Sequence, residues 1–307
     1  MVSGQSRLVG GDMRWLVTGA GGMLGRDLTR LLRGVPGASV HAFTRAELDV
    51  CDPGAVAAAL RAVRPGVVVN CAAWTDVDAA ERDEARAMAV NGTAVAGLAL
   101  ECTRVGARLL QLSTDYVFDG TARTPYAEDA PARPLNAYGR AKLAGEQAAL
   151  GHGHYVVRTA WLYGAHGRSF ARTMAVKAAE GAPVRVVDDQ VGQPTWTVDL
   201  AERLILLGAG HLPPGVYHVT NAGTTSWYGY ARRIFELAGA DPGLVEPVST
   251  AGFPRPARRP AYSVLGDGAW RPPVPMRDWR TALDAAWPHL VAAWGGVVSQ
   301  AAGVGGQ

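Results

Sequence analysis

The chain has 307 residues, of which 48% are hydrophobic, and its 30 Lys and Arg nearly balance its 27 Asp and Glu. This length suffices for about two domains with a large buried core. The near-balanced charge argues against a protein that binds nucleic acid or a membrane surface through bulk electrostatics. Its three cysteines form no CxxC pair, so neither a disulfide framework nor a zinc site is expected. The first dozen residues lack the apolar stretch of a signal peptide, and no apolar run of about 18 residues occurs, which predicts a cytoplasmic protein without a membrane span.

Strand patterns and helix patterns alternate along the first half of the chain. Residues 1–12 are expected to form a flexible extension, and a glycine-rich loop at 19–25 separates the first strand from a helix that runs to Leu32. Strands are expected at 14–18, 39–43, 67–70, 108–112 and 155–158, and further helices at 52–63, 79–105 and 135–150. This alternation predicts an α/β fold with a Rossmann-type doubly wound parallel sheet.

The rhythm weakens after residue 160, and prolines gather in 253–275. We therefore expect a dinucleotide-binding domain over 13–160. A smaller C-terminal region, mainly residues 161–300, is expected to bind the substrate, and the chain is free to cross between the two. Ligands of such sheets bind outside the carboxyl ends of the strands.

Three glycines, Gly19, Gly22 and Gly25, follow the first strand with the spacing G-x-x-G-x-x-G. Glycine in this position lets a pyrophosphate approach the backbone at a helix N-terminus, although any tight strand–helix turn also attracts glycine. The acid that would bind the ribose of NAD is missing after the second strand, where Thr44 and Arg45 stand instead. Arg45 can pair with a 2′-phosphate, so NADPH is the expected cofactor, with NADH as an alternative. A solvated surface arginine is the other interpretation of Arg45.

Lys142 is one of only two lysines in the chain and follows Tyr138 by four residues. On a helix the two side chains share one face. A neighbouring ammonium should lower the pKa of the phenol, which could then give a proton to a carbonyl oxygen while a hydride reaches the carbon. Thr114, just after the strand expected at 108–112, would hold that oxygen. A chance pairing on an amphipathic helix and simple turn chemistry at Thr114 are the alternatives.

Several segments of the chain resemble the dTDP-4-dehydrorhamnose reductases, a family of extended short-chain dehydrogenase/reductases. The resemblance runs from about residue 13 to residue 290. It is carried by the Tyr138–Lys142 pair and by the segments Asn70–Glu81, Ser113–Gly120, Asp189–Thr195, Gly215–Asn221 and Arg259–Ser263. It implies NAD(P)H-dependent reduction of the C4 keto group of a dTDP-6-deoxy-L-hexulose, in the biosynthesis of rhamnose or of another deoxysugar, such as one of an antibiotic.

The resemblance also implies roles for individual residues. Tyr138 would be the proton donor, Lys142 its partner and ribose ligand, and Thr114 a hydrogen-bond donor. The implied cofactor contacts are Gly22, Met23 and Leu24 at the pyrophosphate, Asp49 and Val50 at the adenine, and Ala72, Ala73 and Trp74 at the middle. The expected substrate contacts are Asp115 and Trp161, and charge adds Arg258 and Arg259 for the diphosphate.

The chain departs from the family at two places. Leu265-Gly266 stands where members often have Leu-Asp, and Asp27 occupies the position after the glycine loop where some members use a glutamate to bridge magnesium between subunits. No metal site is therefore assigned, and a monomer and a homodimer both remain open.

Three other functions share much of this pattern. A 4,6-dehydratase needs an acid where this chain has Tyr116, and a 4-epimerase, which retains NAD, fits Arg45 and the 189–195 segment less well. A non-catalytic regulatory subunit of methionine adenosyltransferase is disfavoured by the intact set of Thr114, Tyr138 and Lys142.

Overall fold

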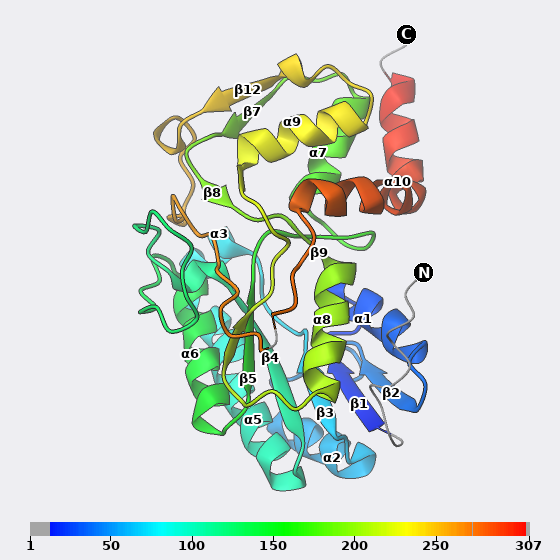
Figure 1. Cartoon of the computed structure of the whole chain (residues 1–307), viewed down its shortest axis with the longest axis vertical. Helices are drawn as coiled ribbons and strands as arrows, with labels where there is room; N and C mark the ends of the chain where they lie inside the picture. Colours follow the sequence, from blue (N-terminus) through cyan, green and yellow to red (C-terminus); the bar gives the residue numbers. More distant parts are fainter. Residues whose placement is uncertain (1–12, 272, 305–307) are drawn as a thin grey trace.

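A six-stranded parallel sheet forms the centre of the lower part of the molecule, in the strand order β10-β5-β4-β3-β1-β2 (Figure 1). The computed structural model describes residues 13–271 and 273–304, so the extension expected at 1–12 lies outside the described residues. The six strands are β1 (Met13–Thr18), β2 (Ala38–Phe43), β3 (Val67–Asn70), β4 (Arg108–Thr114), β5 (Tyr155–Thr159) and β10 (Val216–His218). The predicted doubly wound fold is confirmed.

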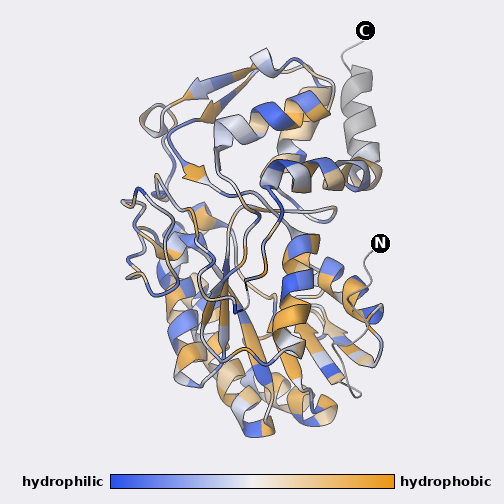
Figure 2. Cartoon of the chain, viewed as in Figure 1, coloured by the Kyte–Doolittle hydropathy of each residue, from blue (hydrophilic) through white to orange (hydrophobic). Residues whose placement is uncertain are grey.

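Helices cover both faces of this sheet, and the alternation of side chains along β1 shows why. Trp15 and Val17 pack against one layer, made of α1 (Met23–Arg33) and α8 (Thr197–Ala209). Leu16 points to the other face and packs with residues of α2 and α5. That second layer consists of α2 (Pro53–Val63), α5 (Ala94–Val105) and α6 (Ala137–Gly151). Figure 2 shows the apolar strands enclosed between the two helical layers. Burial on both faces is what a parallel sheet requires.

The upper part of the molecule has its own core, built around Tyr230, Phe235, Trp279 and Leu283. Its helices are α7 (Phe170–Ala179), α9 (Trp227–Leu237) and α10 (Trp279–Val304), and its short strands pair as β6 (Leu162–Tyr163) with β9 (Thr195–Trp196), β7 (Val184–Val187) with β12 (Val245–Val248), and β8 (Val191–Gly192) with β11 (Thr225–Ser226). Short 3-10 turns are η2 (Asp115–Val117), η3 (Pro242–Leu244) and η4 (Thr250–Gly252). The chain crosses between the parts, since α8 and β10 follow residue 160 yet pack in the lower core.

Two elements differ from the sequence expectation. The single helix expected at 79–105 is divided into α3 (Val77–Arg82), α4 (Glu84–Met88), a π turn η1 (Ala89–Thr93) and α5. Asp83 leaves helical geometry at φ −144° and caps α4 through its carboxylate. Strand β4 continues two residues further than expected, so Thr114 is the last residue of the strand.

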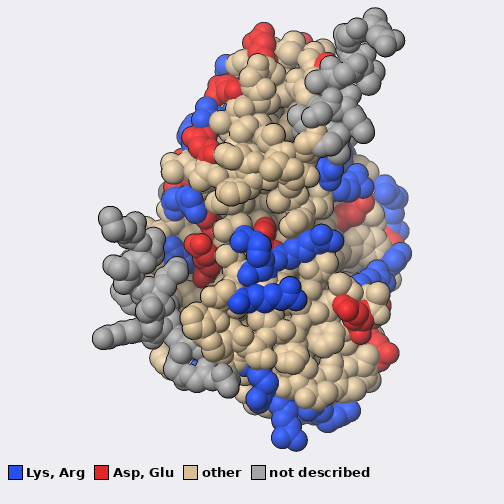
Figure 3. Space-filling model, turned by 90° about the vertical axis from the view of Figure 1, so that its right-hand side faces the viewer, with Lys and Arg blue, Asp and Glu red and all other residues tan. Residues whose placement is uncertain are grey.

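Positive charge gathers on one face of the molecule, although the net charge is only +3. Figure 3 shows Lys and Arg side chains in a band across the middle of that face. In the part of the chain that the structure describes, no helix has the length and apolarity needed to cross a membrane.

Candidate active site

A cavity of about 530 Å³ opens at the carboxyl ends of β1, β2 and β3. This is the edge at which parallel sheets bind nucleotides. The cavity contains eight of the residues expected to bind the cofactor, which are Gly19, Gly22, Arg45, Asp49, Val50, Ala72, Ala73 and Trp74. They come from three separate loops, and the sheet brings them together.

The glycine loop is shaped for the close approach of a ligand to the backbone. Gly19 has a φ of +63°, and a Cβ atom on it would lie 2.6 Å from the backbone nitrogen of Ala72. A Cβ on Gly25 would lie 2.3 Å from the carbonyl oxygen of Gly19. Helix α1 begins after Gly22 with no side chain capping its first turn. A pyrophosphate fits this cradle, because the backbone N–H groups of an uncapped helix N-terminus bind anions.

Three residues expected at the pyrophosphate, Met23, Leu24 and Gly25, do not line the cavity. The side chain of Leu24 is buried in the core below the sheet. These residues lie in the first turn of α1, so they can meet a phosphate only through their backbone N–H groups.

Two arginines line the cavity. Arg45 is 76% exposed, and its guanidinium lies 3.6 Å from the carboxylate of Asp49. Arg86, which the sequence analysis missed, lies with its guanidinium carbon 4.7 Å from the ring centroid of Trp74. Nothing in the sequence marks Arg86, because it stands in a stretch of helical pattern with other charged residues and belongs to no motif.

The proposed catalytic side chains come from α6 and the end of β4. Asn136 caps α6 by accepting a hydrogen bond of 2.8 Å from the backbone N–H of Gly139. Lys142 is 4% exposed and donates from Nζ to the carbonyl oxygen of Leu112 at 2.5 Å. Tyr138, one turn earlier, lies close enough to the side chain of Thr114 for that hydroxyl to influence the pKa of the phenol. The structure thus brings Thr114, Tyr138 and Lys142 to one place at the carboxyl edge of the sheet.

The pKa of Tyr138 differs from the sequence expectation. Burial raises it to about 12, and the nearby Thr114 hydroxyl offsets this only in part. Burial also lowers the pKa of Lys142 to about 8, against the opposing effects of Glu146 and Cys71. Lys142, whose ammonium is bonded to Leu112, is not among the groups that shift the pKa of Tyr138, so the expected lowering is not seen. Tyr138 therefore keeps its proton at neutral pH, as a proton donor must.

Asp115 is only 2% exposed, and its carboxylate is occupied by protein groups. It accepts hydrogen bonds from the hydroxyl of Thr114 at 3.1 Å and from the hydroxyl of Ser263 at 2.5 Å. Burial raises its pKa to about 7. We expected Asp115 to contact the sugar nucleotide. In the structure its carboxylate instead orients the hydroxyl of Thr114 and anchors the segment that contains Ser263.

Trp161 follows β5 at the same edge of the sheet, with a left-handed φ of +46° that is unusual for a bulky residue. Its ring stacks on that of Trp227, with centroids 3.6 Å apart. Gly192 is required beside it, because a Cβ there would lie 2.5 Å from the indole. Strain of this kind is typical of functional sites.

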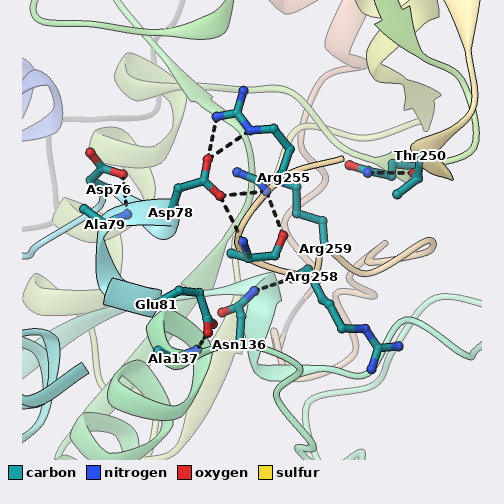
Figure 4. Close-up of polar contacts among 12 residues, drawn as sticks. Asp76, Asp78, Ala79, Glu81, Asn136, Ala137, Thr250, Arg255, Arg258 and Arg259 are labelled. Carbon is teal, nitrogen blue, oxygen red and sulfur yellow. Dashed lines mark hydrogen bonds and ion pairs between the residues drawn. The ribbon is translucent and has the colours of Figure 1, made fainter. Parts of the chain in front are cut away.

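The two arginines expected at the diphosphate behave differently (Figure 4). Arg259 pairs with the carboxylate of Asp78 at 3.1 Å. The side chain of Arg258 is exposed and points away from that carboxylate, while its backbone oxygen accepts a hydrogen bond from Asn136. The structure therefore separates the pair and places only Arg259 next to Asp78.

Comparisons with known proteins show the family of the chain. A sequence profile of the RmlD substrate binding domain matches residues 13–291. The chain is 54% identical over 287 residues to a probable dTDP-4,6-dihydroxy-2-methyloxan-3-one 4-ketoreductase of Streptomyces antibioticus, covering 92% of this chain and 97% of the relative. It is 53% identical over 286 residues to a dTDP-4-dehydrorhamnose reductase of Streptomyces griseus, covering 90% and 94%.

Among solved structures, that of dTDP-4-dehydrorhamnose reductase from Bacillus anthracis in complex with NADP superposes with a TM-score of 0.86. The two sequences are 35% identical, and the superposition covers 91% of this chain and 99% of the Bacillus anthracis chain. The similarity extends through both parts of the molecule and confirms the resemblance read from the sequence: the chain belongs to the dTDP-4-dehydrorhamnose reductase family.

Proposed function

We propose that this chain reduces the C4 keto group of a dTDP-4-keto-6-deoxy-L-hexose with NADPH, yielding dTDP-L-rhamnose or a related deoxysugar. The observation that carries the proposal is the meeting of Thr114, Tyr138 and Lys142 at the carboxyl edge of the sheet, where the cavity lined by the glycine loop opens. Relatives named for the reduction of dTDP-linked keto sugars support the substrate class, and the NADP-bound relative supports the cofactor.

The loops that line the cavity, with Gly19, Arg45 and Ala72 among them, would hold NADPH, which would supply a hydride for C4 of the sugar. Tyr138 donates its phenolic proton to the C4 oxygen, so the C=O double bond becomes a C–H and an O–H bond, and the phenolate regains its proton from solvent. Thr114 can donate to that oxygen once its hydroxyl turns from Asp115. Lys142 stabilises the phenolate and binds the nicotinamide ribose, for which its Nζ must turn from Leu112. Arg45 and Arg86 are the cations available to the 2′-phosphate.

The residue after Asp115 favours reduction over dehydration. A dehydratase needs a carboxylic acid at this position to eliminate water, and this chain has the phenol of Tyr116 there, whose pKa burial raises further. The intact catalytic set likewise favours an enzyme over a regulatory subunit. We propose that the sugar nucleotide binds between the edge of the sheet that holds Tyr138 and the upper part of the molecule. The upper part consists of the residues after 160, without α8 and β10, which belong to the lower part. A cytoplasmic location, and the choice between monomer and homodimer, stay predictions.

A panel of dTDP-linked keto sugars tests the proposal. Each sugar is incubated with NADPH or NADH, cofactor oxidation is followed by absorbance, and the product is identified by NMR. We expect one mole of NADPH to be oxidised per mole of a dTDP-4-keto-6-deoxy-L-hexose, with a hydroxyl at C4 of the product. No oxidation with any sugar of this class would refute the proposed activity.

A further inference from the structure

Asp78, on the short helix α3, is a contact point for a segment far along the chain, residues 253–266 (Figure 4). Its carboxylate accepts hydrogen bonds from Nε and Nη2 of Arg255 at 2.9 and 2.5 Å, from Nη1 of Arg259 at 3.1 Å, and from the backbone N–H of Ala257 at 3.1 Å. Burial would raise the pKa of Asp78, but the hydrogen bonds from the two arginines outweigh it and lower the pKa to about 2. Asp78 is therefore charged wherever the protein works.

The pairing at Asp78 is uneven, since one carboxylate meets two guanidinium groups. Arg255 is half exposed, whereas Arg259 is largely buried. Arg259 uses Nη1 for both Asp78 and the carbonyl oxygen of Ala257. A guanidinium has five N–H donors, so Arg259 keeps donors beyond those that Asp78 and Ala257 engage.

Arg259 lies close to the catalytic site. Its guanidinium lies near the phenol of Tyr116, whose pKa its positive charge lowers against the opposing effect of burial. The ring of Tyr116 in turn meets that of Tyr138 edge-on, with centroids 6.1 Å apart. One aromatic ring therefore separates Arg259 from the proposed proton donor. An anionic group bound to Arg259 would lie next to a sugar whose keto group faces Tyr138.

The backbone around Arg259 is held on both sides. The oxygen of Arg258 accepts a hydrogen bond of 2.7 Å from Asn136, the cap of α6. Further along, Ser263 donates to Asp115. Gly120 packs against Pro260 so closely that a Cβ on it would lie 2.6 Å from the proline. Because the backbone is fixed, only the long side chain of Arg259 can still change its conformation. The hydrogen bond to Asp78 restricts that side chain.

We propose that Asp78 is a positioning residue for substrate binding: it holds Arg259, with Arg255 beside it, so that Arg259 receives the diphosphate of the sugar nucleotide. This rests on the proposed function. Arginine suits the task, because its planar fork binds phosphate oxygens in pairs. The two cations leave a net positive charge after Asp78 is counted, and a preorganised side chain loses less freedom when the ligand binds.

Binding measurements with dTDP and with NADPH test the inference without turnover. In titration calorimetry, Asp78→Asn should raise the Kd for dTDP about tenfold, because a mobile arginine loses its strong charge-assisted contacts. The Kd for NADPH should stay within about twofold, since residues outside that cavity couple weakly to it. Asp78→Glu, which keeps the charge, should recover part of the dTDP affinity. Asp284→Asn is the matched control, because it breaks another aspartate–arginine pair, with Arg233 in the upper part.

The double variant Asp78→Asn/Arg259→Ala shows whether Asp78 acts through Arg259. We expect it to bind dTDP as weakly as Arg259→Ala alone, while independent effects would multiply and overturn the inference. Unchanged or tighter dTDP binding by Asp78→Asn would also overturn it, as would an equal loss for NADPH. If Asp78→Asn fails to fold, the Kd for dTDP is measured for Arg259→Ala and Arg259→Lys instead. An unchanged Kd in both variants overturns the inference. A wild-type protein that binds dTDP but reduces no keto sugar refutes the proposed reaction and leaves this inference intact.

Discussion

Replacing Lys142 by arginine tests whether the site needs a compact ammonium or only a positive charge. Nζ of Lys142 lies 2.5 Å from the carbonyl oxygen of Leu112, on the side of α6 that packs against β4. An arginine must fit a larger planar group into this buried space and cannot lose its charge there. Overpacking a buried position costs about 1–3 kcal/mol. If the whole of this cost raises the free energy of the transition state, the rate falls by about 5- to 150-fold.

Steady-state oxidation of NADPH with dTDP-4-dehydrorhamnose as substrate provides the assay. We expect Lys142→Arg to lower kcat by this amount, about 5- to 150-fold, from the overpacking cost. The matched control is Lys177→Arg at the other lysine of the chain, whose ammonium pairs with Glu180 at the surface. Its kcat should stay within about twofold, because exposed ion pairs contribute little.

A Lys142→Arg variant with the kcat of the wild type would refute this reasoning. It would mean that position 142 supplies charge alone, and that the use of lysine in an arginine-rich chain has no catalytic cause. A loss shared by Lys177→Arg would also count against it, since the effect would then not depend on the site.

Other substitutions test separate parts of the site. Tyr138→Phe should lower kcat by about 10²–10⁴-fold, the usual contribution of a general acid, and leave the Kd for NADPH unchanged; wild-type rates would exclude Tyr138 as the donor. Gly25→Ala should weaken NADPH binding about tenfold or more in a fluorescence titration, because its Cβ would lie 2.3 Å from the oxygen of Gly19, whereas Gly97→Ala meets no atom within 4 Å and serves as control. The pKa of Lys142 is lowered to about 8, so the amine loses its charge as pH rises through that value, and kcat should fall there; a rate that stays flat well above pH 8 would contradict the need for a charged Lys142.

The parts of the site that the sequence predicted are those in which spacing along the chain determines position in space. Tyr138 and Lys142 share a helix face because they are four residues apart. Gly19, Gly22 and Gly25 sit between a strand and a helix that are both evident from their hydrophobic patterns. Thr114 was placed near the edge of the sheet because a polar residue after an apolar strand lies there in any parallel α/β fold.

What the sequence did not predict depends on contacts between distant segments. Asp78 and Arg259 are separated by 181 residues and meet only after α3 and the 253–266 segment are both in place. The break in the helix expected at 79–105 arises at Asp83, whose side chain caps a new helix and so competes with continued helical geometry. The lowered pKa expected for Tyr138 was wrong in direction for this state of the protein, because spacing gives no information about burial or about the bond of Lys142 to Leu112.

Two hydrogen bonds link the segment that contains Ser263 to Thr114, which lies near the proposed proton donor. Ser263 and Thr114 both donate to the carboxylate of Asp115, and the hydroxyl of Thr114 lies close to Tyr138. The carboxylate fixes the direction of the threonine hydroxyl, and its position depends on a serine that lies 148 residues away. The first 160 residues contain all three proposed catalytic side chains but neither β10, α8 nor Ser263. Those residues alone therefore cannot form the site, because the groups that order Thr114 and complete the sheet come from the rest of the chain.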